Sequence, residues 1–449
     1  MENKKRRATF GGKISAVLVA AGSAVGLGNI WRFPYVAGEN GGGAFLLIYI
    51  LCILLLGMPL MIAEFSIGAK SRSNAVGAFR ALGHPRWSTV GYIGIAASVL
   101  ILGFYLVVAG WTAEYMIHSL TDDLVRQSDA ALHQSSCQAF ISHPWKPVFY
   151  TALFAIATHA IIVLGVKKGI ERASKVMMPL LFLILIILAI RSLMMPNGME
   201  GLRFFLAPDF SKVTPATILT ALGQAFFSLS VGLGTMITYA SYFTPDTNIR
   251  QTAFEVGILD TLVAILAGLV IFPAVFSVGI EPDAGPSLVF ITLPSVFSSL
   301  PLSQLWSSIF FLLLVIAALT STISLHEATT AYLAEEWNLP RKHAARLTTL
   351  FTILLGATAS LSLGVLNHWR ICGLSIFDFL DYLTANIMLP LGGVLICLFV
   401  GWRLDRKSFE QQLYGDCKPS LSHGLMRGFI RYLCPFIILC IFLHNLNII

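Results

Sequence analysis

Long apolar stretches, separated by short polar segments, follow one another along the whole chain. A helix that crosses a membrane needs about 20 mainly apolar residues, and eleven stretches come close to or exceed that length. The predicted spans cover residues 13–37, 43–69, 88–119, 148–166, 169–193, 216–242, 253–280, 304–336, 340–364, 376–401 and 424–446. The pattern therefore predicts an all-α polytopic membrane protein with eleven transmembrane helices.

Composition supports a membrane protein and excludes an ordinary soluble globule. Of the 449 residues, 56% are hydrophobic and only 12% are charged, about half the charged fraction of a soluble domain. The seven cysteines have neither CxxC spacing nor a histidine pattern, so we interpret them as packing residues. The N-terminus carries no signal cleavage site, so residues 1–12 should be a short segment ahead of a retained first helix.

The basic residues predict the orientation in the lipid bilayer. With the N-terminus in the cytoplasm, the inner segments hold 23 of the 30 Lys and Arg residues and the outer segments hold six. The remaining one, Arg32, is assigned to neither side. The positive-inside rule therefore predicts a cytoplasmic N-terminus and an external C-terminus. This distribution also explains the net charge of +7 without nucleic acid as a partner.

The tetrapeptide VGLG occurs twice, at Val25–Gly28 in the first span and at Val231–Gly234 in the sixth. The copies take corresponding positions in two sets of five helices, residues 13–193 and 216–401, and residues 424–446 follow as a final helix. An odd number of spans inverts the second set relative to the first. Inverted repeats with two glycine-broken helices are typical of secondary transporters.

Broken helices in a membrane predict a binding site. Their free N–H and C=O groups must be buried in protein or line a cavity. The carbonyls suit a monovalent cation or an ammonium group, and the N–H groups of the following half-helix suit a carboxylate. Together these describe an amino acid. Glycine-mediated helix packing is the alternative, but it does not explain Asn29 and Ser228 at the two breaks.

The eighth predicted span places Ala317, Thr320 and Ser321 at positions i, i+3 and i+4. One carbonyl and two hydroxyl groups therefore lie on the same side of that helix. Ser and Thr in spanning helices usually bond to their own backbone, so the triplet alone leaves both interpretations open.

Four motifs carry a resemblance to a known family: SAVGLGNIWRFPY, ENGGGAF, GQAFFSLSVGLG and ALTST. Nearly the whole chain resembles the neurotransmitter:sodium symporter family, and in particular its bacterial amino-acid branch with eleven spans. The resemblance implies a 5+5 inverted repeat with broken helices 1 and 6, and a transporter rather than an enzyme. It further implies sodium-coupled symport by alternating access in the bacterial cytoplasmic membrane.

The resemblance also implies two sodium sites. The second site would use Gly22, Val25, Ala317, Thr320 and Ser321. The first site would use Ala24, Asn29, Ser228 and Asp260, together with the carboxylate of the substrate. Many relatives carry Asn where this chain has Asp260. An ionised carboxylate there would supply the negative charge that eukaryotic relatives take from chloride, so we expect chloride independence; a neutral, hydrogen-bonded Asp260 is the alternative.

The residues implied for the substrate favour a neutral hydrophobic L-amino acid. Its carboxylate would meet the N–H groups of Leu27 and Gly28 and the hydroxyl of Tyr105. Its amine would meet carbonyl or hydroxyl oxygens of Ala24, Phe227, Ser228 and Ser230. Gly26 stands where monoamine-transporting relatives have Asp, so the substrate must bring its own acid. The side-chain pocket would be formed by Ile101, Phe227, Leu233, Thr322 and Leu325, which favours an apolar group.

The family resemblance implies a gate on each side of this site. A basic residue deep in the bilayer needs an acidic partner; for Arg32 the resemblance implies Asp381, with Tyr105 and Phe227 as the lid, while Glu39 competes. On the inner side, Arg7 and Phe10 would pair with Glu335 and Tyr242, although basic residues near the membrane surface also serve as lipid anchors.

Other polar or helix-breaking residues within the spans allow two interpretations each. The Gly169 to Pro179 spacing resembles a segment that unwinds in some bacterial relatives, but Gly and Pro are also common in spanning helices. Glu64 and Glu114 favour structural hydrogen bonds over a proton path, and the role of Glu327 stays open.

Three other functions compete with sodium symport. A proton-coupled amino-acid permease of the same fold would lack the hydroxyls of Thr320 and Ser321 or carry a Lys nearby. A channel would have no use for paired gates. An enzyme would need a catalytic motif, and the chain has neither HExxH nor a P-loop. The sequence specifies neither the preferred amino acid, nor the sodium stoichiometry, nor an oligomeric state.

Overall fold

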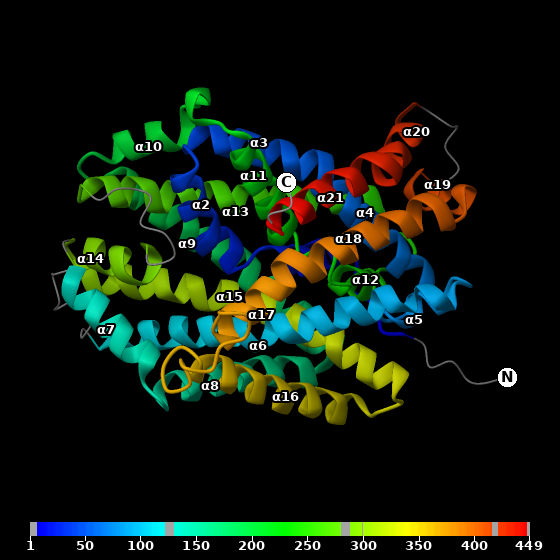
Figure 1. Cartoon of the computed structure of the whole chain (residues 1–449), viewed down its shortest axis with the longest axis horizontal. Coiled ribbons are helices and arrows are strands. Elements are labelled where there is room, and N and C mark those ends of the chain that lie inside the picture. Colours follow the sequence, from blue (N-terminus) through cyan, green and yellow to red (C-terminus); the bar gives the residue numbers. More distant parts are fainter. Residues whose placement is uncertain (1–6, 122–129, 280–287, 299, 415–420, 447–449) are drawn as a thin grey trace.

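The structure, a computed structural model, describes residues 7–121, 130–279, 288–298, 300–414 and 421–446. Within these residues the backbone is helical, and the β-pairings are two isolated bridges, Gly42 with Pro208 and Ile371 with Leu374. Figure 1 shows the long helices lying roughly along the longest axis, with α7, α10 and α14 at one end and α5, α19 and α20 at the other. This arrangement is typical of a bundle of membrane-spanning helices with shorter helices near its two ends.

The described helices, with η marking short turns of tighter or wider helix, have the following bounds: α1 (Lys13–Ala24), η1 (Gly28–Arg32), α2 (Phe33–Glu39), α3 (Gly43–Cys52), η2 (Ile53–Gly57), α4 (Met58–Ser71), α5 (Gly77–Ala81), η3 (Pro85–Trp87), α6 (Ser88–Leu120), α7 (Ala130–Ser142), α8 (Lys146–Val163), η4 (Val166–Glu171), α9 (Arg172–Leu193), α10 (Gly198–Leu206), η5 (Phe210–Lys212), α11 (Pro215–Ser228), α12 (Thr235–Ala240), α13 (Ile249–Ser277), η6 (Leu288–Thr292), α14 (Leu293–Ser298), α15 (Ser303–Glu336), α16 (Arg341–Leu361), α17 (Ile376–Tyr382), η7 (Leu383–Met388), α18 (Leu389–Leu398), η8 (Phe399–Arg403), α19 (Arg406–Tyr414), α20 (Leu421–Gly428), η9 (Phe429–Leu433) and α21 (Cys434–Asn445).

Nine stretches of helix within the described residues are long and apolar enough to cross a membrane, and the bent pair at the start of the chain makes a tenth. The nine are Gly43–Ser71, Pro85–Leu120, Lys146–Val163, Val166–Leu193, Ile249–Ser277, Ser303–Glu336, Arg341–Leu361, Ile376–Arg403 and Gly424–Asn445. Each coincides, within a few residues at either end, with one of the predicted spans.

The sixth predicted span, residues 216–242, is not one helix. It forms α11 of 14 residues and α12 of 6 residues, each too short to cross a bilayer alone. Between them the backbone has positive φ at Ser230 (52°), Gly232 (85°) and Gly234 (72°). A right-handed helix cannot pass through such residues, which is why the described chain contains ten candidate spans instead of the eleven predicted.

The first span is interrupted where the glycine pattern predicts. Its two parts, Lys13–Ala24 and Gly28–Glu39, meet at 52°. Val25 at the break is extended, with φ −71° and ψ 114°. The two breaks lie deep in the protein, since Val25, Leu27, Leu229 and Val231 are all at most 1% exposed.

The outer helices show two apolar faces, as expected for helices between protein and lipid. In α9, Met178, Leu181 and Leu185 are buried, whereas Leu183 and Ile190 are more than half exposed. An exposed stripe of large aliphatic side chains is costly in water but not in a bilayer.

Six of the seven cysteines are described; they are free thiols and form no disulfide, while Cys417 lies outside the described residues.

Close helix packing brings the broken segments against the long helices. α1 packs against α13, α15 and α9, and α12 packs against α4 and α15. Gly68 in α4 allows this approach, since a Cβ at that position would stand 2.0 Å from the Ile237 carbonyl oxygen. The bundle thus places both interruptions next to α6, α13 and α15.

Candidate functional site

A central cavity lies where the two helix breaks meet α6 and α15. Thirteen residues line it: Ala24, Gly26, Gly28, Ile101, Tyr105, Phe227, Ser228, Ser230, Leu233, Ser321, Ser324, Leu325 and Leu389. Ten of the twelve residues expected to bind substrate are among them. The cavity combines backbone groups of the breaks with aliphatic and aromatic walls, which is the composition typical of a small-molecule site.

Leu27 and Thr322 are the two expected substrate residues that do not line the cavity. The Leu27 N–H donates to the Tyr105 hydroxyl at 3.0 Å, so it faces the cavity through Tyr105. The Thr322 hydroxyl lies 2.9 Å from that of Thr158 in α8. The expectation for Thr322 is therefore corrected: successive residues of a helix point about 100° apart, and Thr322 faces the neighbouring helix.

Ser324 and Leu389 line the cavity although the sequence motifs did not point to them. Ser324 lies three residues after Ser321 and donates to its carbonyl at 2.7 Å, so helical spacing could have identified it. Leu389 begins α18, far along the chain, and only the tertiary structure brings it to the cavity.

Gly26 is required by close contact. A Cβ at this position would stand 2.2 Å from the Ser321 hydroxyl oxygen and 3.0 Å from that of Tyr105. Ordinary carbon–oxygen contacts are much longer, so a Cβ fits only if the Ser321 hydroxyl moves away from the first break. The backbone of the first break thus approaches two hydroxyl groups directly.

Three of the four residues expected at the first sodium site, Asn29, Ser228 and Asp260, form one buried cluster. Asn29 Nδ2 lies 2.8 Å from both Ser228 Oγ and Asp260 Oδ1. Ser228 Oγ also donates to the Asp260 carboxylate, at 2.9 and 3.0 Å. Tyr49, which the sequence reasoning missed, donates to Asp260 Oδ2 at 3.1 Å. The cluster gathers hydroxyl and carboxylate oxygens, which hard cations prefer, while the Asn29 amide oxygen accepts the Gly26 N–H at 3.1 Å.

Asp260 is a buried carboxylate whose surroundings suit a bound cation. It is fully buried, and its hydrogen-bond partners among the described residues are Asn29, Ser228 and Tyr49, none of which is positively charged. A buried carboxylate without a counter-charge is costly. A sodium ion beside Asp260 would supply that charge, so the carboxylate and the Ser228 hydroxyl fit the ion that the sequence led us to expect.

Four of the residues expected at the second sodium site also converge. The Thr320 hydroxyl lies 3.2 Å from the Val25 carbonyl oxygen and 2.9 Å from that of Ala317. A methyl group on Gly22 would stand 3.7 Å from the Thr320 Cβ. Thr320 thus bonds both to its own helix and across to the break. The Ser321 hydroxyl lies beside this group, against Gly26.

The outer gate is arranged differently from the expected ion pair. The charges of Arg32 and Asp381 act on each other, but they do not form a direct ion pair among the described residues. The Arg32 guanidinium instead lies 4.6 Å from the centre of the Phe227 ring. An outer cavity, which includes Arg32 and Asn386 in its wall, shares Phe227 and Leu389 with the central cavity.

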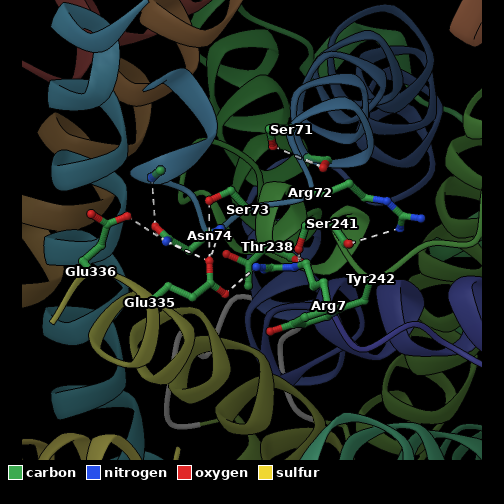
Figure 2. Close-up of polar contacts among 12 residues, drawn as sticks. Arg7, Ser71, Arg72, Ser73, Asn74, Thr238, Ser241, Tyr242, Glu335 and Glu336 are labelled. Carbon is green, nitrogen blue, oxygen red and sulfur yellow. Dashed lines mark hydrogen bonds and ion pairs between the residues drawn. The ribbon is translucent and has the colours of Figure 1, made fainter. Parts of the chain in front are cut away.

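The residues expected at the inner gate are in contact with one another. Figure 2 shows Arg7 paired with Glu335 beside Tyr242. Arg7 lies 4.7 Å from the centre of the Tyr242 ring, and the Phe10 N–H donates to the Tyr242 carbonyl at 2.8 Å. Phe10 itself is buried. These contacts attach the segment before α1 to the end of α12.

Glu327 takes a structural role that the sequence left open. Its carboxylate receives two hydrogen bonds from Arg341, at 2.6 and 2.9 Å, and one from the Tyr242 hydroxyl at 2.8 Å. Arg341 begins α16, and the sequence reasoning assigned it only to topology. A buried acid within a span needs a counter-charge, and that requirement is the signal that could have pointed to a basic partner for Glu327.

The other acids within the spans are also hydrogen-bonded. Glu64 accepts the Gly232 N–H of the second break at 2.5 Å, and Glu114 lies 3.0 Å from His118. In the fifth predicted span, residues 169–193, the wide turn η4 contains Gly169, and α9 continues through Pro179. The predicted unwinding between these two residues stays a prediction.

Comparison with known proteins identifies the family. The model of the sodium:neurotransmitter symporter family matches residues 7–146 and 141–449. The chain belongs to this family. A sodium-dependent transporter of Bacillus subtilis (strain 168), YhdH, is 38% identical over 449 residues, covering 99% of each chain. A sodium-dependent transporter of Haemophilus influenzae is 39% identical over 457 residues, again covering 99% of each.

A solved structure agrees with the fold of this sodium:neurotransmitter symporter family member. The crystal structure of MhsT in complex with L-phenylalanine matches with a TM-score of 0.90 and 44% identity, covering 98% of this chain and 100% of that one. The resemblance drawn from the four motifs is confirmed. The protein is a multi-pass membrane transporter of a sodium-dependent family and not an enzyme.

Proposed function

We propose that this transporter is a sodium-coupled symporter of neutral hydrophobic L-amino acids. The observation that carries the proposal is the central cavity: both broken helices bring backbone groups to it, and the remaining walls are largely apolar. The residues lining the cavity include no charged side chain within the described part of the chain. A zwitterion with an apolar side chain satisfies both halves of such a cavity.

Two parts of the cavity receive the two parts of the substrate. Tyr105 and the N–H groups after the first break bind the carboxylate, and the Ser228 and Ser230 region binds the amine. Ile101, Leu233 and Leu325 surround the side chain. Phenylalanine bound to MhsT supports a ligand of this class, because 44% of residues are shared over nearly the whole chain.

Two sodium ions would couple transport to the sodium gradient. The first binds at Ala24, Asn29, Ser228 and Asp260, next to the substrate carboxylate. The second binds at Gly22, Val25, Ala317, Thr320 and Ser321, and ties the first break to α15. Because Asp260 provides a negative charge within the protein, transport proceeds without chloride.

The two gates support alternating access, and in the proposed cycle this structure is a state whose central cavity opens toward the outer side. Arg7 and Glu335 close the inner side, while Arg32 and Asp381 are not directly paired and the outer cavity adjoins the central one. In the proposed topology the bundle has eleven spans in two inverted sets of five, with α11 and α12 together as the sixth. It lies in the bacterial cytoplasmic membrane with the N-terminus inside.

Uptake of radiolabelled L-amino acids into proteoliposomes tests the proposal. An inward sodium gradient should drive accumulation of leucine, phenylalanine or tryptophan, in chloride or in gluconate, while aspartate, lysine and carboxylate-free amines should not compete. Accumulation driven by a proton gradient in the absence of sodium would identify the alternative, a proton-coupled permease of the same fold. The Thr320 hydroxyl against Val25 argues against that alternative.

A further inference from the structure

Asn74 connects the segment between α4 and α5 to the end of α15. Its side chain is wholly buried. Oδ1 accepts the N–H groups of Val76 and Gly77, at 2.9 and 3.0 Å. Nδ2 donates to Glu335 Oε2 and to Glu336 Oε1, each at 3.0 Å. A primary amide offers two donors and two acceptor positions, and Asn74 uses all four.

The two acids bound by Asn74 occupy an unfavourable place. Glu335 and Glu336 are the last residues of α15, where the helix dipole is negative and further negative charge is destabilising. Each carboxylate has one oxygen paired with an arginine, Glu335 with Arg7 and Glu336 with Arg80. The other oxygen of each carboxylate accepts from Asn74. Two adjacent acids at this helix end are therefore held by donors from three other segments.

The hydrogen bonds reach the inner gate without interruption. Glu335 Oε2 also accepts the backbone N–H of Asn74 at 3.0 Å. Figure 2 shows Asn74 and Arg7 on opposite sides of Glu335. Arg7 in turn belongs to the segment whose Phe10 N–H is bonded to Tyr242. A change at Asn74 thus reaches the segment before α1 through a single carboxylate.

We propose that Asn74 is a positioning residue for closure of the inner side. It orients Glu335 toward Arg7 and Glu336 toward Arg80, and so stabilises the state in which the segment before α1 covers the central cavity. The proposal rests on the proposed function only in assuming that this closure opens and re-forms during transport. If Asn74 only caps α5, loss of its two donors should leave the segment before α1 unchanged.

Hydrogen–deuterium exchange on the full-length protein in sodium-containing nanodiscs separates the two roles. Asn74→Asp keeps acceptors for Val76 and Gly77 but removes both donors and adds a third carboxylate. Amides of residues 8–12 should then exchange about tenfold faster than in wild type, because local opening becomes more frequent. Residues 75–82 should keep their wild-type rates. Asn74→Ala, which removes cap and donors together, should accelerate exchange in both segments.

A matched control exists at the start of α13. Asn248 caps that helix through the Gln251 N–H at 3.0 Å, and its side chain is exposed. Asn248→Ala should leave residues 8–12 unchanged, whereas Glu335→Gln should accelerate them as Asn74→Asp does. Wild-type exchange at residues 8–12 in Asn74→Asp would overturn the proposal and leave Asn74 as a cap of α5. These exchange measurements use neither substrate nor a gradient. If amino-acid uptake failed, the role proposed for Asn74 could still be tested by them.

Discussion

At the scale of single residues, close contacts in the site decide which glycines can be replaced by a residue with a Cβ. Gly26 leaves no room for a Cβ beside Ser321 and Tyr105. Gly28, two residues on, is in ordinary contact, since a Cβ there would lie 3.4 Å from the Phe227 ring. The two glycines of one motif therefore differ in what they tolerate.

Gly26→Ala should impair substrate binding far more than Gly28→Ala. The added methyl would push Ser321 away from the first break, and a collision of this kind costs about 1–3 kcal/mol. We expect an apparent KM raised about tenfold or more for Gly26→Ala. Gly28→Ala should stay within about threefold of wild type. Uptake kinetics of both variants in proteoliposomes check this, and similar values for the two would contradict the assignment of Gly26.

Asp260 permits a second test at the same scale. Wild-type uptake should be equal in chloride and in gluconate, because Asp260 supplies the charge that balances sodium in a low-dielectric site. Asp260→Asn removes that charge, and its uptake should become dependent on chloride. Glu114→Gln, a change at an acid outside the cluster, is the control and should show no chloride dependence. A wild-type protein that requires chloride would refute the role given to Asp260.

At the scale of elements, the decisive feature is the non-helical segment between α11 and α12. Its shape depends on Gly232, which has φ of +85° and donates its N–H to Glu64. A Cβ at Gly232 would stand 2.6 Å from the Leu389 carbonyl oxygen. Conformation and packing thus both require glycine at this position.

Gly232→Ala should abolish most transport. The left-handed conformation alone costs a residue with a Cβ about 1–2 kcal/mol, and the contact with Leu389 adds to that. We expect uptake reduced more than about tenfold and a lower melting temperature of the purified protein. Gly223→Ala in α11 is a matched control, since a Cβ there meets nothing within 4 Å. Equal loss in both variants would show that the break does not depend on Gly232.

At the scale of the whole molecule, different kinds of side-chain contact hold the two ends of the bundle. The inner end is held by Arg7 with Glu335 and by Arg341 with Glu327. At the outer end Arg32 lies over Phe227. In the proposed topology, two Arg–Glu ion pairs thus hold the inner side, whereas Arg32 and Asp381 at the outer side form no direct ion pair among the described residues.

Asp381→Asn should reduce transport more than binding. In the proposed cycle Asp381 neutralises Arg32 only when the outer side closes, so its loss slows a conformational step and leaves the binding site intact. The maximal uptake rate should fall about tenfold while the affinity for substrate, measured by equilibrium binding, changes less than threefold. A larger effect of Glu39→Gln would identify Glu39 as the partner of Arg32 instead.

The sequence by itself determined the class, ten of the eleven predicted spans and most of the residues that line the central cavity. Hydrophobic length and the Lys and Arg distribution follow from the cost of polar groups in lipid, which acts on each segment separately. The VGLG copies and Asn29 marked both breaks, because a helix interruption in a membrane requires special residues locally. The four motifs contain eight of the thirteen residues that line the cavity, and the family resemblance added Ile101, Tyr105 and Leu325.

Only the tertiary structure decided which side chains face one another. Thr322 turned toward Thr158, Leu389 reached the cavity from α18, and Tyr49 joined Asp260. The partners Arg341 for Glu327 and Asn74 for Glu335 came from segments without a shared motif. Such contacts depend on the rotation and packing of whole helices, and periodicity within one segment carries no information about the neighbour it will meet.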